Sequence, residues 1–242
     1  MRIYKFLLVY IFGTLISCSE IKEPSLKNFV IQDDVFKSGI SLIDLPYGLH
    51  DLEDTSLDQS TLIVGVHGSN SRGYEWVYPL LTLDEETNLV SFFRWDDNNC
   101  HGSSSSFLLE TIKRKLVESP KIQKVVIYGH SYGGILVASL LEEWNLQIPL
   151  LANAIAAPLK GMGQLSEACD YKPLASVKTG TRLHQWRTIK NLDGAFKDLD
   201  YDPQNAEIMG SQVTRLPKTY KGKKLGHNWS ISWVADEISN TK

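Results

Sequence analysis

The sequence predicts an α/β fold in which a mostly parallel central sheet carries helices on both faces. Two observations lead to this prediction. Apolar or β-branched runs bounded by turn residues alternate with stretches of helical periodicity, and the chain has 242 residues, of which 43% are hydrophobic. Strands that alternate with helices are joined by right-handed crossovers, which give parallel pairing. The length and apolar content suit one globular domain with a full-sized core.

Five runs have the composition of buried strands. They cover residues 60–68, 89–95, 124–130, 149–157 and 181–188. Helical periodicity is found at residues 105–119 and 132–144. The second helix is apolar on most of its surface, as expected of a helix that covers the middle of a sheet. In an open parallel sheet, ligands bind at the carboxyl ends of the strands, so candidate functional residues are expected there.

Residues 1–18 differ in composition from the rest of the chain. Arg2 and Lys5 give a positive start, and residues 6–16 form an apolar run that is too short to span a bilayer. The sequence "LISC" completes this segment and is similar to a lipobox, in which the cysteine is lipidated and begins the mature chain. A signal cleaved elsewhere, with Cys18 there by chance, is the alternative.

The lipobox resemblance implies a division of the chain and a location. Residues 1–17 would be the signal peptide, residues 18–40 a lipid-anchored tether, and residues 41–242 the folded domain. Ser19, rather than aspartate, follows the cysteine, and this favours the outer membrane of a bacterial cell envelope, facing the periplasm. The chain is therefore expected to meet a membrane through its N-terminal lipid anchor.

Export also bears on the two remaining cysteines. In an oxidising compartment, Cys100 and Cys169 are expected to pair as a disulfide, with two free thiols as the alternative. Neither has the CxxC spacing of a redox or zinc site, so no metal and no other cofactor is expected. A formal net charge of -3 gives no sign of a nucleic-acid partner.

Ser131 lies at the centre of the motif "GHSYGG", between a predicted strand and a predicted helix. The motif is similar to the G-x-S-x-G nucleophile elbow of the α/β-hydrolase fold, and the resemblance covers roughly residues 55–242. In such a strained strand-to-helix turn, the residues two positions from the nucleophile pass too close for side chains, which accounts for Gly129 and Gly133. The resemblance implies that Ser131 is a nucleophile.

A serine nucleophile needs a histidine that takes its proton, and the chain has six histidines. The chain order of the family points to His227, in the loop "KLGHNWS" before the last apolar run. The others have a different expected role or the wrong place in the order. His67 belongs to a structural turn, His130 would point away from the nucleophile, His184 lies inside a strand, and His50 and His101 are out of chain order.

The acid that orients the histidine is sought after the last predicted strand. The segment offers Asp193, Asp198, Asp200 and Asp202. The stretch "DGAF" at Asp193 is similar to the pattern that follows this strand in many lipases and esterases, where the carboxylate meets the imidazole. Asp198 is the alternative, and the last three aspartates also fit a solvated acidic loop.

The same resemblance implies an oxyanion hole made of two backbone N–H groups. One belongs to Ser69, directly after the "HG" that ends an earlier strand, and the other to Tyr132, directly after the nucleophile. Donors already aimed at the developing negative charge stabilise the tetrahedral intermediate. Because only backbone atoms act, the two side chains are free to vary.

The spacing of the site residues limits what covers the site. Only about sixty residues separate Ser131 from Asp193, so no large cap domain is expected between them. Any lid would come from residues 159–179, a short segment of mixed composition.

Two further stretches are candidates for contact with a substrate. The loop at residues 70–78 carries Tyr74 and Trp76 and would form a second wall, although such aromatic side chains also pack inside proteins. The basic stretch at residues 215–224 would be a solvated surface or would receive anionic lipid head groups.

These features predict a serine hydrolase, without metal or cofactor, that cleaves carboxylic esters of lipids or small lipophilic molecules through an acyl-enzyme on Ser131. A thioesterase, an amidase or an acyltransferase would use the same residues, because a fold does not fix a substrate. From another class, a non-catalytic envelope lipoprotein could use the fold as a binding module.

Overall fold

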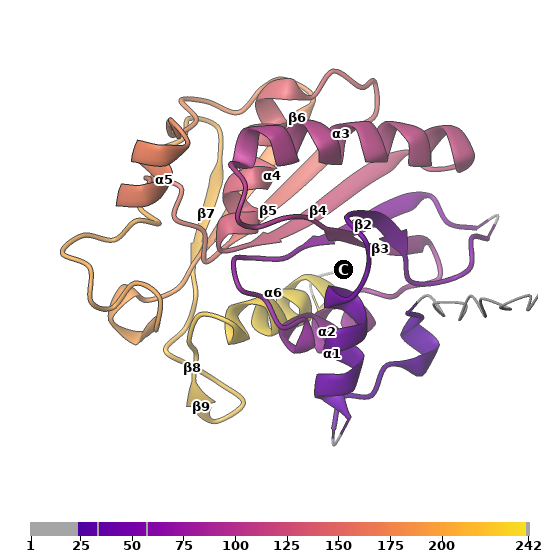
Figure 1. Ribbon diagram of the computed structural model, residues 1–242, viewed down its shortest axis with the longest axis horizontal. Coiled ribbons are helices and arrows are strands. Elements are labelled where there is room, and N and C mark those ends of the chain that lie inside the picture. Colours follow the sequence, from indigo (N-terminus) through magenta and orange to yellow (C-terminus); the bar gives the residue numbers. More distant parts are fainter. Residues whose placement is uncertain (1–23, 33, 57, 241–242) are drawn as a thin grey trace, which may run out of the picture.

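A seven-stranded sheet forms the centre of the molecule (Figure 1). The computed structural model describes residues 24–32, 34–56 and 58–240. Within these residues the strand order is β1-β3-β2-β4-β5-β6-β7, with β1 antiparallel to β3 and the other neighbours parallel. The strands are β1 (Gly48–Asp51), β2 (Thr61–Val66), β3 (Asn88–Arg94), β4 (Lys124–His130), β5 (Leu150–Ile155), β6 (Thr181–Arg187) and β7 (Gln212–Arg215), and β8 (Thr219–Tyr220) with β9 (Lys223–Lys224) forms a separate hairpin.

Helices cover both faces of the sheet, and an apolar cluster fills the space under each layer (Figure 1). One face carries α3 (His101–Glu118) and α4 (Tyr132–Glu143), and the other carries α1 (Val35–Ile43), α2 (Tyr74–Thr82) and α6 (Trp229–Asn240). The short elements are α5 (Gly163–Ala168) and the 3-10 helices η1 (Leu26–Asn28) and η2 (Lys190–Leu192). Among the helices that the structure describes, none combines the length and the apolar character needed to cross a membrane.

The central strand β4 is buried because it has neighbours on every side. It pairs with β2 and β5, so that Ile127 lies opposite Val64 on one side and Ala152 on the other. Every residue of β4 after Lys124 is buried. A strand covered on both faces must be apolar along its whole length, which is why this run shows no polar alternation. The carboxyl end of β4 therefore lies in the middle of the sheet edge.

The predicted strands and helices are present, and the sheet has two more strands than predicted. The five predicted runs form β2 to β6, and the two predicted helices are α3 and α4. The two edge strands, β1 ("GLHD") and β7 ("QVTR"), were not predicted. Apart from Gly48, all their residues are half-buried or exposed. Such short polar edge strands lack the apolar run by which buried strands are found.

The folded domain begins earlier than the predicted boundary at residue 41. Leu26 is buried, and its N–H donates to the carbonyl oxygen of Leu52 at 2.8 Å. Leu42 of α1 is fully buried in the cluster beneath α2 and α6. The described residues from 24 onward therefore pack on the domain and do not form a tether, which corrects the prediction for this part of residues 18–40. The predicted signal peptide and Cys18 lie outside the described residues.

A disulfide joins Cys100, directly before α3, to Cys169, directly after α5. This is the pairing that the sequence analysis expected. In the same segment, Tyr171 and Leu159 are buried, and the Tyr171 hydroxyl donates to the Leu159 carbonyl oxygen at 2.9 Å. The connection between β5 and β6 is thus fixed to the α3 face of the sheet, and no large cap domain is inserted between Ser131 and Asp193.

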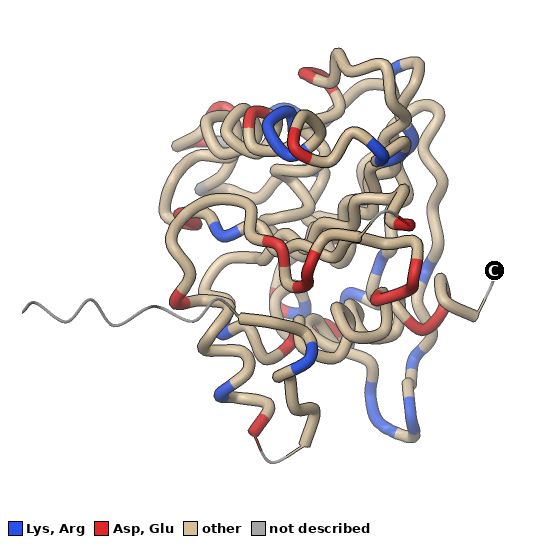
Figure 2. The backbone as a smooth tube through the Cα atoms, turned by 90° about the vertical axis from the view of Figure 1, so that its right-hand side faces the viewer, with Lys and Arg blue, Asp and Glu red and all other residues tan. Residues whose placement is uncertain are grey.

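The basic stretch at residues 215–224 includes the β8–β9 hairpin, where Lys and Arg gather at the lower edge of the molecule (Figure 2). Lys221 pairs with Asp236 of α6 at 3.3 Å, and the Lys223 ammonium lies 5.7 Å from the centre of the Trp229 ring. Part of this positive charge is therefore held against α6.

Candidate active site

Ser131 stands directly between β4 and α4. Its backbone has φ 54° and ψ -118°, which residues other than glycine rarely adopt. Its N–H donates to the carbonyl oxygen of Ile155 in β5 at 2.9 Å, and its own carbonyl oxygen accepts from Gly134 at 3.0 Å. Such a conformation costs about 1–3 kcal/mol and persists only where its surroundings hold it. Ser131 therefore lies on a strained turn at the carboxyl edge of the central strand.

Two glycines make this turn sterically accessible. A Cβ on Gly129 would lie 2.7 Å from Cγ2 of Val137 and would overlap the carbonyl oxygen of Gly133. A Cβ on Gly133 would lie 2.5 Å from the carbonyl oxygen of Val66, in the neighbouring strand β2. Both positions therefore exclude a side chain, as the elbow motif predicts.

Asp193 and His227 form a hydrogen-bonded pair in the site. The side chain of Asp193 is 0% exposed, and His227 Nδ1 lies 3.0 Å from each of its carboxylate oxygens. The Thr188 hydroxyl donates to Oδ2 at 2.5 Å, and the Ala195 N–H donates to Oδ1 at 2.9 Å. Since an ionised carboxylate only accepts, Nδ1 of His227 carries the hydrogen, and Nε2 is left to take a proton.

Burial distinguishes the two aspartates that the sequence left open. Asp193 lies just after β6 and η2, and it contacts the imidazole of His227. The side chain of Asp198 is 84% exposed and lies 3.6 Å from the ammonium of Lys197. Of the two candidates, only Asp193 is placed to orient the histidine.

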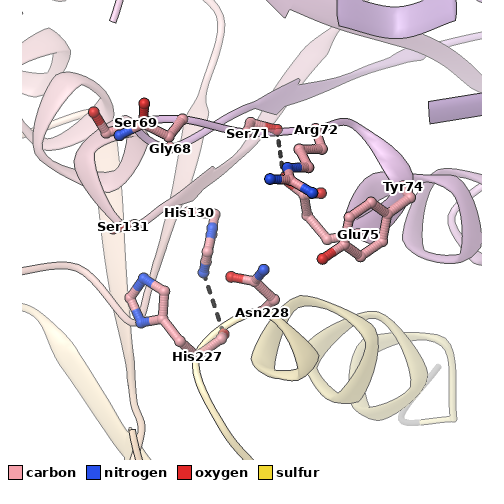
Figure 3. Close-up of a pocket in the computed structure, with 11 residues that line it drawn as sticks. Gly68, Ser69, Ser71, Arg72, Tyr74, Glu75, His130, Ser131, His227 and Asn228 are labelled. Atoms are coloured by element: carbon pink, nitrogen blue, oxygen red, sulfur yellow. Dashed lines mark hydrogen bonds between the residues drawn. The ribbon is translucent and has the colours of Figure 1, made fainter. Parts of the chain in front are cut away.

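The ring of His227 is held between two other rings. Phe196 meets it edge-on at a centroid distance of 5.1 Å, and His130 lies on another side at 4.6 Å. The expectation that His130 points away from the nucleophile was wrong, because His130 lines the same cavity as Ser131. Its Nε2–H donates to the carbonyl oxygen of His227 at 3.2 Å (Figure 3). Burial, followed by the charge that His227 gains on protonation, lowers the pKa of His130 well below its ordinary value. His130 is thus a neutral support for the loop of His227.

Ser131 and His227 line the same cavity, which has a volume of about 160 Å³ (Figure 3). His130 and Asn228 contribute to the same wall as His227. Among the described residues, no group hydrogen-bonds to Nε2 of His227. A hydroxyl and an imidazole therefore meet at one hollow of the surface, with the buried carboxylate of Asp193 behind the imidazole.

The loop after β2 brings Gly68 and Ser69 to this cavity. In the part of the chain that the structure describes, neither the backbone N–H of Ser69 nor that of Tyr132 donates to a protein acceptor. Tyr132 directly follows Ser131 at the first position of α4. Both N–H groups that the sequence analysis named are therefore free to donate to a bound oxygen.

Comparison with known proteins gives matches only at the level of structure. No protein-family model and no curated protein matches the sequence. A solved α/β serine hydrolase without lid from Xanthomonas campestris is similar, with a TM-score of 0.50 and 15% identity over 79% of this chain and 85% of that one. Est1E from Butyrivibrio proteoclasticus has a TM-score of 0.53 and 11% identity over 80% and 90% of the two chains.

A third solved structure, the poly(3-hydroxybutyrate) depolymerase LpqC from Bordetella parapertussis, has a TM-score of 0.52 and 12% identity and covers 87% of each chain. The mostly parallel seven-stranded sheet with helices on both faces matches the fold of these neighbours. The chain has the α/β-hydrolase fold. At identities of 11% to 15%, the likeness concerns the fold alone.

Of the two aromatic residues expected to form a wall of the site, only one does so in this α/β-hydrolase fold. Trp76 is fully buried between α2 and the sheet, where it meets Phe92 edge-on at 5.9 Å. Tyr74 lines the cavity of Ser131 and packs against Phe36 of α1. Trp76 therefore packs in the hydrophobic core and does not line the cavity.

Several residues of the site were not found from the sequence. They are Thr188, which supports Asp193, and the cavity residues Arg72, Glu75 and Asn228. Glu75 has a recognisable sequence signal, since it is the single charged residue inside the aromatic and apolar run "YEWVYPLL". A lone acid on an otherwise buried helix face is unusual and points to a specific role.

His67 holds the loop that carries Ser69. Its Nδ1–H donates to the carbonyl oxygen of Gly68 at 2.9 Å, and its Nε2 accepts from Arg94 at 3.1 Å and from the Trp95 N–H at 3.4 Å. Burial is the main cause that lowers the pKa of His67 to about 4, and the guanidinium of Arg94 adds to it. The neutral imidazole thus has the structural role that the sequence analysis expected.

The depressed pKa of His67 makes stability depend on pH. In the unfolded chain the imidazole takes up a proton near pH 6.5, but in the folded protein only near pH 4. Its contribution is therefore fully present above about pH 6.5 and is lost towards pH 4, by about 3 kcal/mol at about 1.4 kcal/mol per pH unit. We expect His67→Gln, which keeps one donor and one acceptor, to show a shallower pH dependence of the free energy of unfolding, measured with urea from pH 7 to pH 4. An unchanged slope would contradict this assignment.

Proposed function

We propose that this chain is a serine hydrolase that cleaves carboxylic esters through an acyl-enzyme on Ser131. The observation that carries the proposal is that Ser131, on its strained turn, lines the same cavity as the imidazole of His227. The Nδ1 atom of this imidazole is hydrogen-bonded to the buried Asp193. The names of two fold neighbours, an α/β serine hydrolase and a poly(3-hydroxybutyrate) depolymerase, support hydrolytic chemistry.

The proposed reaction has two similar halves. His227 Nε2 takes the proton of Ser131 as Oγ attacks the ester carbonyl, and the N–H groups of Ser69 and Tyr132 stabilise the oxyanion. The imidazolium then gives its proton to the departing alcohol, which leaves an acyl group on Ser131. A water molecule repeats the sequence, releases the carboxylic acid and restores the serine. Asp193 keeps its negative charge and stabilises the imidazolium in each half.

The lipophilic part of the proposed substrate is supported by a cleft beside the Ser131 cavity. This cleft has a volume of about 300 Å³ and shares Ser71 and Arg72 with that cavity. Its apolar lining comes from α1, where Phe36 is 60% exposed and Ile40 is 54% exposed. Exposed apolar side chains next to a reactive group favour esters of lipids or small lipophilic molecules.

We also propose that Cys18 carries a lipid that anchors the protein in a bacterial cell envelope, at the outer membrane and facing the periplasm. The lipobox-like "LISC" after an apolar run is the main support. The disulfide between Cys100 and Cys169 is a second support, because structural disulfides persist in oxidising compartments.

Ser131→Ala should abolish ester hydrolysis, because no other group in the proposed mechanism forms the acyl-enzyme. The measurement is the release of 4-nitrophenol from 4-nitrophenyl esters of increasing acyl length, with protein that begins after Cys18. The variant should keep its unfolding midpoint, since the hydroxyl makes no hydrogen bond in the described part of the protein. Activity that survives in Ser131→Ala would remove the proposal.

The two aspartates provide a matched pair of substitutions. Asp193→Asn should lower kcat by about a thousandfold to ten-thousandfold, because the amide no longer stabilises the imidazolium and can favour the wrong tautomer. Asp198→Asn changes an exposed carboxylate in the same loop and should leave kcat within about twofold. The reverse pattern would move the acid to Asp198.

Cys18→Ala should give an unlipidated protein, because only a thiol at this position accepts the lipid. Metabolic labelling with an alkyne analogue of palmitate should mark the full-length chain and fail to mark the variant. Label that persists in Cys18→Ala would refute the lipid anchor without touching the hydrolase proposal.

A further inference from the structure

Glu75 is a buried acid in the wall of the Ser131 cavity. It lies in the first turn of α2 and is 9% exposed. Its Oε1 accepts a hydrogen bond from the hydroxyl of Ser71 (Figure 3). Its Oε2 is buried and has no hydrogen-bond partner among the described residues. A buried carboxylate oxygen without a donor costs free energy, so an unpartnered Oε2 on a residue that lines the cavity of Ser131 favours a bound ligand there.

The position of Glu75 on α2 explains why an acidic residue is tolerated there, but it does not explain why Oε2 has no hydrogen-bond partner. A carboxylate in the first turn of a helix interacts favourably with the positive end of the helix dipole. That interaction requires neither that Oε2 be unpartnered nor that the side chain line the cavity. The helix therefore tolerates the acid, whereas the unpartnered Oε2 has no role in the fold of the described residues.

The side chains around Glu75 define what kind of group the cavity accepts. Arg72 and Asn228 line the same cavity (Figure 3). Among the ion pairs of the described residues, none involves the guanidinium of Arg72. The wall thus offers an acceptor at Glu75 and donors at Arg72 and Asn228. A hydroxyl group both donates and accepts, and so satisfies both kinds of neighbour. An ammonium group would be repelled by the guanidinium of Arg72, and an anion would be repelled by the carboxylate of Glu75. An alkyl group would leave the polar atoms of Glu75, Arg72 and Asn228 without hydrogen-bond partners.

The same cavity contains the base that protonates the leaving group. Asn228 directly follows His227, and both line the cavity together with Glu75. In the proposed reaction, His227 gives its proton to the alcohol oxygen of the ester, so the alcohol half lies beside the imidazole. The polar wall therefore faces the alcohol half of the substrate.

We propose that Glu75, Arg72 and Asn228 form a subsite for a hydroxyl group on the alcohol half of the ester, as in an acylated polyol. This assignment rests on the proposed function. In this assignment, a hydroxyl group of the substrate binds at Glu75, and an apolar part binds in the neighbouring cleft of α1. The proposed substrate is therefore an amphiphilic ester.

Matched esters test the subsite. The pair 2-hydroxyethyl butyrate and propyl butyrate differ by a terminal hydroxyl in place of a methyl group, and released butyric acid is titrated at constant pH. With the intact protein, kcat/KM should be about tenfold to a hundredfold higher for the hydroxylated ester, because a hydrogen bond to a charged group is formed in one case only. A ratio near one would overturn the subsite.

Variants at position 75 assign the preference to the carboxylate. Glu75→Met keeps the size of the side chain and removes both acceptors, so the ratio should fall to within about twofold of one. Glu75→Gln keeps the bond with Ser71 and should give an intermediate ratio, which preserves the test if the methionine variant does not fold. Glu86→Gln, at an exposed position after α2, is the matched control and should keep the full ratio. If both variants at position 75 kept the same ratio of kcat/KM between the two esters as the intact protein, the role of Glu75 would be overturned.

A third ester separates a hydroxyl site from a cation site. If 2-(dimethylamino)ethyl butyrate, which is cationic near neutral pH, is cleaved faster than the hydroxylated ester, the polyol assignment is wrong. If all esters are cleaved at equal rates by Ser131, the hydrolase proposal stands and the subsite falls. If the intact protein cleaves none of these esters, so that its rate of acid release equals that of Ser131→Ala on each of them, both proposals fall.

Discussion

The backbone of Ser131 is the constraint on which the rest of the site depends. It is held in a sparsely populated conformation by strands on both sides: β5 accepts its N–H at Ile155, and β2 lies so close that Gly133 has no room for a side chain. A parallel sheet with β4 at its centre supplies these neighbours, and the apolar clusters on the two faces fix the strands. The strain of about 1–3 kcal/mol is small against the burial that holds it.

His227, the proposed base, comes to the cavity of Ser131 from a distant part of the chain because its loop precedes α6. Asp193, the proposed acid, follows β6 and lies behind the imidazole. Asp193 is buried under donors from Thr188 and Ala195, so that its charge is directed at one imidazole nitrogen. The rings of Phe196 and His130 fix the plane of that imidazole. This preorganisation leaves the cavity itself for substrate, and Glu75 makes part of its wall polar. In the proposed mechanism, the site combines a fixed acid–base pair with a polar wall that contacts the substrate.

The features that the sequence predicted are those encoded in local patterns. Central strands are apolar along their whole length, and the elbow joins a strand, a glycine-flanked serine and a helix in one stretch, so both were found. The edge strands β1 and β7 are too polar for that signal. Asp193 and Asp198 lie five positions apart in one loop, and only burial separates them. The contact between the rings of His130 and His227 and the unpartnered Oε2 of Glu75 depend on how distant segments pack together, which a single sequence does not display.

The central claim is that His227 and Asp193 make a nucleophile of Ser131, and covalent trapping tests it most directly. A fluorophosphonate reacts with an activated serine without needing a correct substrate. After reaction and proteolysis, mass spectrometry should find a single phosphonyl adduct on the peptide that contains Ser131. In His227→Ala, the rate of adduct formation should fall by at least about a hundredfold. An adduct on another residue, or an unchanged rate in His227→Ala, would contradict the account.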